Sequence, residues 1–204
     1  MKVVYITRHT KPDKTKYIKS DNELEQNKSI ELSEQGIKDA KNFFKKKEFN
    51  DIQNIYCSDY KRSYETGKLS DKNVIIDKRL GERITGTPDY SLTPNEYFYK
   101  QTLDENYKFI NGESKKEIQN RMYNALIDIL NKETKTLIIS HGTSMTFLLM
   151  KLCNIEISNI ENKIRKISFN NKIIFEDKFN FLQTFKLVFN DDNKLIDIKP
   201  LEII

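Results

Sequence analysis

The sequence predicts an α/β fold: a three-layer α/β/α sandwich with a mainly parallel sheet, in a single domain over residues 1–204. Short β-branched runs alternate with amphipathic segments, which is the pattern of parallel strands covered by helices. A length of 204 residues suits one well-buried domain, and no Gly/Ser linker or internal repeat divides the chain. In residues 160–204, stretches that alternate between apolar and polar residues predict additional antiparallel strands.

The first strands and helices follow one another closely along the chain. Residues 2–7 form a short apolar run that predicts a buried strand. Ser33 is placed to cap a helix, because apolar residues recur after it at helical spacing. Residues 52–57 predict the second strand, residues 60–69 a helix, and residues 74–76 the third strand.

The segment 83–112 is irregular, with prolines and a concentration of aromatic residues. Two interpretations stay open at this point: a lid over the leaving group of a substrate, or ordinary helix packing. If the segment is a lid, we expect Tyr90, Tyr97 and Lys100 to contact the substrate.

The later elements continue the alternation. A capping box that begins at Ser114 predicts an amphipathic helix. Residues 136–140 predict a β-branched strand, and residues 143–152 the helix after it. Residues 184–189 alternate as a strand, and residues 191–193 predict a hairpin turn.

Composition narrows the class of protein. Hydrophobic residues make up 37% and charged residues 32% of the chain, which is typical of a globular protein with a solvated surface. The sequence shows no secretory signal, and no run reaches the about 20 apolar residues of a membrane helix. We therefore expect a cytoplasmic protein that does not bind membranes.

The net charge of +5 does not indicate a nucleic-acid interface. Only six of the 35 basic residues are Arg, and the Lys residues are scattered along the chain. No cluster of His, Cys and acidic residues has metal-ligand spacing. We expect no nucleic-acid partner, no metal and no cofactor, and the sequence leaves the oligomeric state open.

Both histidines of the chain follow predicted strands. His9 comes directly after the first strand, and His141 directly after the strand at 136–140. Ligands of open α/β sheets bind at the carboxyl ends of the strands, so the two side chains are candidates for one site. Arg8 precedes one histidine, and Arg62 falls on the first turn of a helix near the same edge. Guanidinium groups hold phosphate in a bidentate manner, which predicts a phosphate ligand.

Six short motifs in this order resemble the histidine phosphatase (phosphoglycerate-mutase-like) superfamily. They are Arg8-His9-Thr10, Leu32-Ser33 with Gly36, Ser58 with Arg62 and Thr66, Leu80-Gly81-Glu82, Gly112-Glu113-Ser114 with Arg121, and Ser140-His141-Gly142. The resemblance covers residues 2 to about 150, and no comparable marker follows residue 160.

The resemblance implies catalytic roles for three residues. His9 would attack phosphorus and form a phosphohistidine, with His141 beside the phosphoryl oxygens. Glu82 would protonate the leaving oxygen and then help to activate water. For this its pKa must rise by burial, although arginines nearby lower it. An alternative is that Glu82 only pairs with Arg79 or Arg83.

Four further residues are candidates for phosphate binding. The resemblance places Arg8 and Arg62 around the phosphoryl oxygens, and the backbone N–H of Gly142 opens a helix that favours anions. Thr10 stands where the family usually has Gly, and a β-branched residue does not easily adopt a positive φ. Its hydroxyl is therefore a further candidate for contacting phosphate.

Residues 11–14 lack the E-S-x-x-N continuation of phosphoglycerate mutases, and no His-Asp pair of the acid-phosphatase branch is present. These departures favour the phosphatase branch. The leading hypothesis is a metal-independent phosphomonoesterase that acts on a small phosphorylated metabolite. Mutase-type phosphoryl transfer and a catalytically inactive binding module on the same fold are the alternatives.

Overall fold

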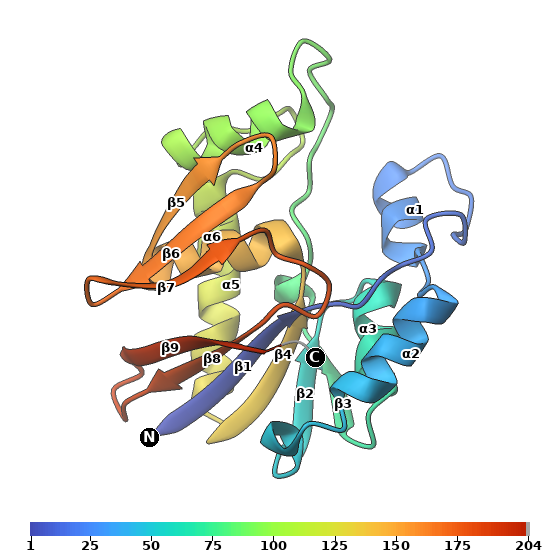
Figure 1. Cartoon of the computed structure of the whole chain (residues 1–204). Helices are drawn as coiled ribbons and strands as arrows, with labels where there is room; N and C mark the ends of the chain where they lie inside the picture. The colour runs from blue at the N-terminus through green and yellow to red at the C-terminus, as the bar shows by residue number, and fades with distance from the viewer. Residues whose placement is uncertain (203–204) are drawn as a thin grey trace.

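The computed structural model describes residues 1–202 and confirms the α/β fold (Figure 1). Its central six-stranded sheet has the strand order β3-β2-β4-β1-β8-β9. The first four strands in this order run parallel, whereas β8 is antiparallel to β1 and to β9. The strands are β1 (Lys2–Arg8), β2 (Asn54–Cys57), β3 (Asn73–Ile76), β4 (Lys135–Ser140), β8 (Thr184–Phe189) and β9 (Leu195–Leu201).

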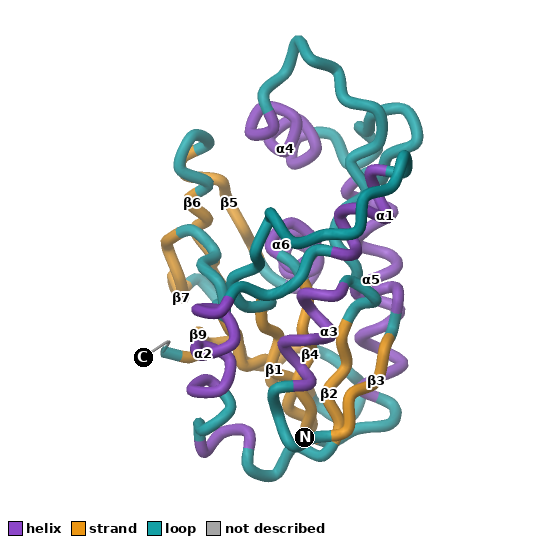
Figure 2. Tube along the Cα trace, turned by 90° about the vertical axis from the view of Figure 1, so that its right-hand side faces the viewer, coloured by secondary structure: helices purple, strands orange, loops and turns teal. Residues whose placement is uncertain are grey.

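Helices cover both faces of this sheet. In Figure 2, α2 (Glu34–Phe43) and α3 (Lys61–Lys68) lie toward the viewer, with the strands behind them. The opposite face packs against α5 (Lys115–Leu130) and α6 (Gly142–Leu152). Side chains alternate along β1, so that Tyr5 belongs to the core beneath α2 and its neighbours Val4 and Ile6 to the core beneath α5 and α6.

Capping explains where these helices begin. The side chain of Ser33 accepts the N–H of Gly36 at the start of α2, as predicted. Ser114 and Glu117 form the predicted capping box of α5. Two short 3-10 helices, Lys47–Phe49 and Lys78–Leu80, complete this part of the fold.

The predicted antiparallel strands are present, but they begin before residue 160. A second, three-stranded sheet has the order β5-β6-β7, with β5 (Asn154–Asn159), β6 (Ile164–Phe169) and β7 (Lys172–Asp177). Ile167 on β6 is fully buried in the same core as α5 and α6. The predicted hairpin turn joins β8 to β9, where Asn193 has a φ of 59°.

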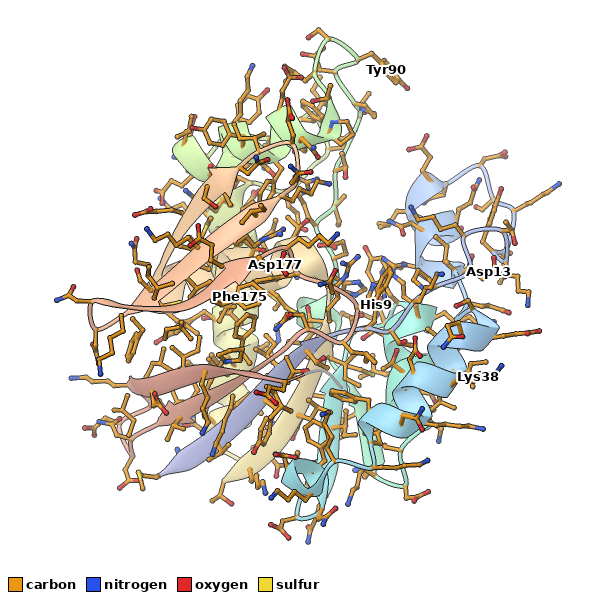
Figure 3. The ribbon with its side chains drawn as sticks, in the orientation of Figure 1. His9, Asp13, Lys38, Tyr90, Phe175 and Asp177 are labelled. Carbon is orange, nitrogen blue, oxygen red and sulfur yellow. The ribbon has the colours of Figure 1, made fainter. Side chains whose placement is uncertain are left out.

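Two helices were not predicted: α1 (Glu23–Ser29) and α4 (Pro94–Leu103). Helix α4 lies within segment 83–112 and favours the packing interpretation, because Tyr97 is 1% exposed and its ring stacks on Phe109 at 3.7 Å. Tyr90 is 91% exposed at the tip of its loop (Figure 3), and Lys100 is exposed on α4. The substrate contacts of Tyr90, Tyr97 and Lys100, expected only if the segment is a lid, stay predictions; in this structure the side chain of Tyr97 is buried.

Candidate active site

The two histidines lie side by side at the carboxyl edge of the central sheet. Strands β1 and β4 are parallel neighbours with Arg8 in register with Ser140, so the next residues, His9 and His141, meet. Their ring centroids are 5.0 Å apart, and both side chains are buried. Figure 3 labels His9 at this edge. The structure therefore brings the predicted pair together.

The His9 ring is held in one orientation. Its Nδ1 bonds to the backbone carbonyl of Thr10 at 2.7 Å, so Nδ1 carries the proton and Nε2 keeps its lone pair. Arg62 donates its Nε–H to this Nε2 at 3.2 Å. Burial, followed by the charges of His141, Arg62 and Arg8, holds the pKa of His9 well below its usual value despite the bond to Thr10. The ring is thus neutral, as a nitrogen nucleophile requires.

His141 presents a proton donor to the same hollow. The hydroxyl of Ser58 lies 2.7 Å from Nε2 and also accepts the N–H of Tyr60 at 3.4 Å. A serine that donates to Nε2 leaves the proton of a neutral ring on Nδ1. Burial, then Arg62, Arg121 and Arg8, keep the pKa of His141 well below its usual value. Sequence reasoning did not assign this orienting role to Ser58, although the residue stands in one of the motifs.

The guanidinium groups of Arg8 and Arg62 flank the histidines. Arg62 is 6% exposed, and its Nη1 donates to the carbonyl of Asn27 on α1 at 2.6 Å. Arg8 donates from Nη1 to the carbonyl of Phe179 at 2.6 Å. Burial is the main cause that lowers the pKa of each arginine. Both groups stay cationic, because guanidinium deprotonates only at very high pH.

Two donors in this hollow have no partner. Within residues 1–202, the buried side-chain nitrogens and oxygens without a hydrogen bond are Arg8 Nε and His141 Nδ1. Buried polar groups are nearly always paired, and leaving one unpaired costs about 1–3 kcal/mol. Two unpaired donors that flank a neutral imidazole indicate a site for an anion with several acceptor oxygens.

Gly142 begins α6, so its N–H is a first-turn donor without an intrahelical acceptor. A Cβ added to Gly142 would lie 3.6 Å from Arg8 Nε, which shows that the helix start and the guanidinium are adjacent.

The expected role of Thr10 is wrong: its fully buried hydroxyl donates to the Gly36 carbonyl at 3.0 Å. Thr10 therefore ties the loop to α2, and it is not among the residues with a positive φ.

Glu82 lies at the same edge of the sheet. Within residues 1–202, its carboxylate oxygen Oε1 accepts hydrogen bonds and its Oε2 accepts none. Its Oε1 accepts the N–H of Arg83 at 2.9 Å and both the N–H and the hydroxyl of Ser144 at 3.2 Å. The alternative pairing with Arg79 is not made, because that side chain pairs with Asp77 and Asp128.

The charge state of Glu82 differs from the expectation. Burial raises its pKa, but the Arg83 N–H, the charges of Arg83 and Arg62, and the Ser144 N–H outweigh burial and lower it. Without an anion in the hollow, Glu82 is therefore a carboxylate. A proton has to reach it together with the substrate before it can serve as an acid.

Arg121 holds the loop that carries Glu82. It forms a bidentate pair with Glu113 at 2.7 and 2.9 Å. Its Nη1 donates to the carbonyls of Arg79 and Gly81, and its Nη2 to that of Glu82 at 3.3 Å. The G-E-S…R motif thus fixes the position of the Glu82 backbone through three carbonyl contacts.

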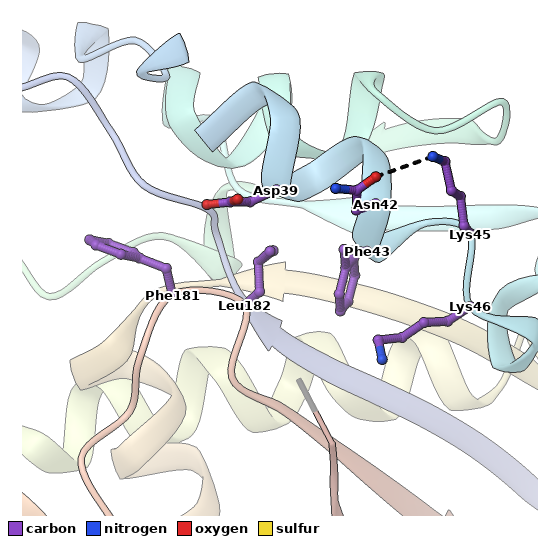
Figure 4. Close-up of a pocket in the computed structure, with 7 residues that line it drawn as sticks. All are labelled: Asp39, Asn42, Phe43, Lys45, Lys46, Phe181 and Leu182. Atoms are coloured by element: carbon purple, nitrogen blue, oxygen red, sulfur yellow. Dashed lines mark hydrogen bonds between the residues drawn. The ribbon is translucent and has the colours of Figure 1, made fainter. Parts of the chain in front are cut away.

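An aromatic wall that sequence reasoning missed closes one side of the site. The ring of Phe181 lies 4.3 Å from Arg8 Cζ, and its centroid lies 5.8 Å from that of His9. No motif marks Phe181, and the antiparallel pairing of β8 with β1 brings it here. Behind it, a pocket of about 610 Å³ (Figure 4) contains neither histidine; it is lined by Asp39, Asn42, Phe43, Lys45, Lys46, Phe181 and Leu182.

No three His, Cys, Asp or Glu side chains in residues 1–202 gather as a set that could hold a metal ion. No helix in the same range is long and apolar enough to cross a membrane.

An α/β sheet that carries a buried neutral imidazole, two arginines and a second histidine at its carboxyl edge defines the class of the protein, the histidine phosphatases. The chain belongs to the histidine phosphatase superfamily (branch 1), whose family model matches residues 4–185. No curated protein matches the chain by sequence at a significant level.

Solved structures share this fold over nearly their whole length. A mycobacterial protein described as hydrolase 1 is 16% identical with a TM-score of 0.66, covering 98% of this chain and 99% of its own. A mycobacterial glucosyl-3-phosphoglycerate phosphatase with VO3 is 17% identical with a TM-score of 0.65, covering 98% and 97%. A putative α-ribazole-5′-phosphate phosphatase from Escherichia coli is 15% identical with a TM-score of 0.62, covering 98% and 96%.

Proposed function

We propose that this protein is a metal-independent phosphomonoesterase that acts on a small phosphorylated metabolite through a phosphohistidine at His9. The observation that carries the proposal is the hollow beside His9 Nε2, which holds the unpaired donors of Arg8 and His141. Donors aimed at one point before a ligand arrives are what an in-line phosphoryl transfer needs.

In the first step, the His9 Nε2 lone pair attacks phosphorus while the bond from phosphorus to the leaving oxygen breaks. Glu82 gives its proton to that oxygen, and Arg8, Arg62 and His141 bind the remaining phosphoryl oxygens. In the second step, Glu82 takes a proton from water, the water oxygen attacks phosphorus, and the P–N bond breaks. This returns a neutral His9 and releases inorganic phosphate.

The free oxygen of Glu82 suits this exchange. Its Oε1 is held by Arg83 and Ser144, which leaves Oε2 to carry a proton. A bound phosphate offsets the arginine charges that lower the pKa of Glu82, so the pKa rises when the substrate binds. A monoanionic substrate would bring the needed proton with it.

Hydrolysis is favoured over mutase-type transfer and over an inactive binding module. Two of the solved structures with this fold are described as phosphatases acting on glucosyl-3-phosphoglycerate and α-ribazole-5′-phosphate. An inactive module would have no need of a nucleophile, an acid and orienting contacts together. The cytoplasmic location stays a prediction from the sequence.

Hydrolysis of 4-nitrophenyl phosphate in the presence of EDTA tests the proposal. We expect wild-type turnover that His9→Ala lowers by about 10⁴-fold or more. Acid-labile, base-stable labelling of the wild type by a radioactive phosphate ester would mark the phosphohistidine. Lys38→Ala, an exposed change on α2 (Figure 3), is the control and should keep full activity.

Turnover that survives His9→Ala would refute the nucleophile, and turnover that EDTA abolishes would refute metal independence. Faster exchange between 2- and 3-phosphoglycerate than hydrolysis of either would favour the mutase. Steep salt-dependent binding of nucleic acid without any hydrolysis would favour the binding module.

A further inference from the structure

Three cations outside the phosphate hollow gather beside it without acidic partners. They are Arg83, which follows Glu82, and Lys163 and Arg165 at the β5–β6 turn. Arginine is scarce in this chain, and Arg165 is one of only six. Its position on a buried face is therefore notable: the side chain is 5% exposed, and buried arginines are rare unless they are paired.

Contacts with both walls of the active site hold Arg165 in place. Its Nε donates to the hydroxyl of Thr146 on α6 at 2.7 Å, and that hydroxyl donates to the carbonyl of Gly142. Its Cζ lies 4.6 Å from the centroid of the Phe179 ring, and the carbonyl of Phe179 is the acceptor for Arg8. Arg165 thus sits one residue layer from the phosphate hollow.

The turn before Arg165 is fixed as well. Lys163 adopts a φ of 55°, and its carbonyl accepts the Nη1–H of Arg165 at 2.7 Å. Asn95 at the start of α4 donates to the carbonyl of Glu161 at 3.0 Å, which ties the turn to α4. Figure 1 shows this turn next to α4.

Arg83 reaches the same helix from the other side. Its Cζ lies 4.6 Å from the centroid of the Tyr97 ring, and its Nη1 donates to Gln101 at 2.7 Å. Both partners are neutral. Helix α4 therefore contacts both the Arg83 side chain and the β5–β6 turn. In this way one helix holds three cations from two distant segments.

The charges of this region do not balance. Five cations lie in and beside the site: Arg8, Arg62, Arg83, Lys163 and Arg165. Within residues 1–202 none of them forms an ion pair with a carboxylate, and the nearby Glu113 is already paired with Arg121.

Glu82 supplies one negative charge, and a phosphate dianion would supply two. Two positive charges then remain. Asp177, opposite Arg165 in the β6–β7 ladder, is exposed and makes no ion pair with it. Burial lowers the pKa of Arg165 to about 10, with Arg8 adding to the effect. Burial also lowers the pKa of Lys163, followed by the charges of Arg165, Arg83 and Arg8.

We propose that Lys163 and Arg165, with Arg83 beside them, form a second anion subsite that binds a negatively charged group on the leaving portion of the substrate. The substrate class is then a phosphate monoester that carries a further carboxylate or phosphate. This inference rests on the proposed function, because the phosphate bound beside His9 sets where the second group falls.

Calorimetric titration with benzylphosphonates tests the subsite by binding alone. Phosphonates have no ester bond to hydrolyse, so the result does not depend on turnover. The probes carry a carboxylate, or the isosteric carboxamide, at the meta or para position. We expect the full-length wild type to bind one carboxylate isomer about tenfold more tightly than its carboxamide, as for hydrogen bonds to charged groups.

Two variants and one control locate the effect. Lys163→Ala, an exposed change, should lower the preference for carboxylate about two- to fivefold. Arg165→Gln keeps a donor for Thr146 and should remove most of the preference. Lys172→Ala, at the other tip of the same sheet, should retain it.

Equal affinity for carboxylate and carboxamide in the wild type, for both isomers, would overturn the subsite. A preference that survives both Lys163→Ala and Arg165→Gln would place it on other residues and overturn the assignment. If the protein hydrolyses 4-nitrophenyl phosphate but binds the carboxylate and carboxamide probes equally, the subsite is refuted and the phosphatase activity is not. If the protein prefers the carboxylate probe but does not hydrolyse 4-nitrophenyl phosphate, the phosphatase activity is refuted and the subsite is not. Failure to bind any phosphonate would overturn the subsite, and failure to hydrolyse 4-nitrophenyl phosphate as well would overturn both.

Discussion

The phosphate hollow and the cap above it are built in different ways. We use "cap" for segment 83–112 with α4, together with the β5–β7 sheet. The hollow takes its side chains from the ends of adjacent parallel strands and from helix starts, so backbone geometry fixes them. The cap holds its cations through side-chain contacts with Thr146, Gln101 and aromatic rings.

This difference indicates that the hollow serves the proposed reaction and that the cap selects the substrate. A hollow fixed by strand ends offers the same donors to every phosphate ester. A cap held by side chains can change its charge without disturbing the sheet, since its contacts lie outside the central strands. We therefore expect changes among the phosphate-binding groups of the hollow to affect all substrates alike, and changes at the acid Glu82 to affect them according to the basicity of the leaving oxygen. Changes in the cap should affect substrates according to the charge of their leaving portion.

After His9→Ala, the largest effect is expected for Glu82→Gln in the hollow. Loss of a general acid lowers turnover by about 10²–10⁴-fold. The loss should be greater for phenyl phosphate than for 4-nitrophenyl phosphate, because the poorer leaving group needs the proton more. Steady-state kcat for the two esters measures this. An equal loss for both esters would show that Glu82 is not the acid.

A smaller effect is expected for Arg121→Met, at the joint between hollow and cap. This change removes the bonds that Arg121 donates to the carbonyls of Gly81 and Glu82, and misplacement of the acid should lower kcat about 10- to 100-fold. The loss should again be greater for phenyl phosphate, because Arg121 acts through Glu82. Arg79→Met is the matched control: Arg79 is also ion-paired nearby but bonds to Asp77 and Asp128.

If Arg79→Met and Arg121→Met lower kcat equally, the contacts of Arg121 with the Glu82 loop are not what positions the acid. A uniform loss on both esters would indicate only a general disturbance of the fold.

The smallest effect is on the thermal stability of the fold, and it comes from the two histidines of the hollow. Both histidines have pKa values well below 6.5 in the folded protein, so below pH 6.5 the unfolded chain takes up protons that the folded one does not. Stability is therefore full above pH 6.5 and falls as the pH drops. Between pH 7.5 and 5.5 we expect Tm to fall by about 3–8 °C.

Scanning calorimetry at several pH values measures this fall, and His9→Gln should reduce it by about half. A Tm that stays constant over this range would contradict buried, neutral histidines. Above pH 5.5 the carboxylates contribute little, because their pKa values lie lower still.

The sequence predicted the hollow better than the cap, for a physical reason. Strands that end at a histidine and helices that begin at Ser33 or Ser114 are local signals. Parallel pairing then places the strand ends together without further information.

The cap depends on contacts between distant segments. Arg165 and Phe181 reach the site through the pairing of β6 and β8, which no local pattern specifies. For α4 a signal was present and overlooked: Thr93 and Glu96 form a capping box with Pro94 at the first helical position. Because few residues of α4 are buried, its sequence has no apolar stripe that would mark an amphipathic helix. Thr10 was misassigned because its partner, Gly36, lies on another element.

The position of β1 has a consequence for how the chain assembles. This strand leads directly to His9, the proposed nucleophile, yet its two neighbours in the sheet are residues 135–140 and 184–189. During synthesis the first strand therefore waits with both hydrogen-bonding edges open until residues 135–140 have emerged, and with one edge open until residues 184–189 have emerged. Such distant pairing is slow to form, and it leaves the growing chain dependent on protection against aggregation.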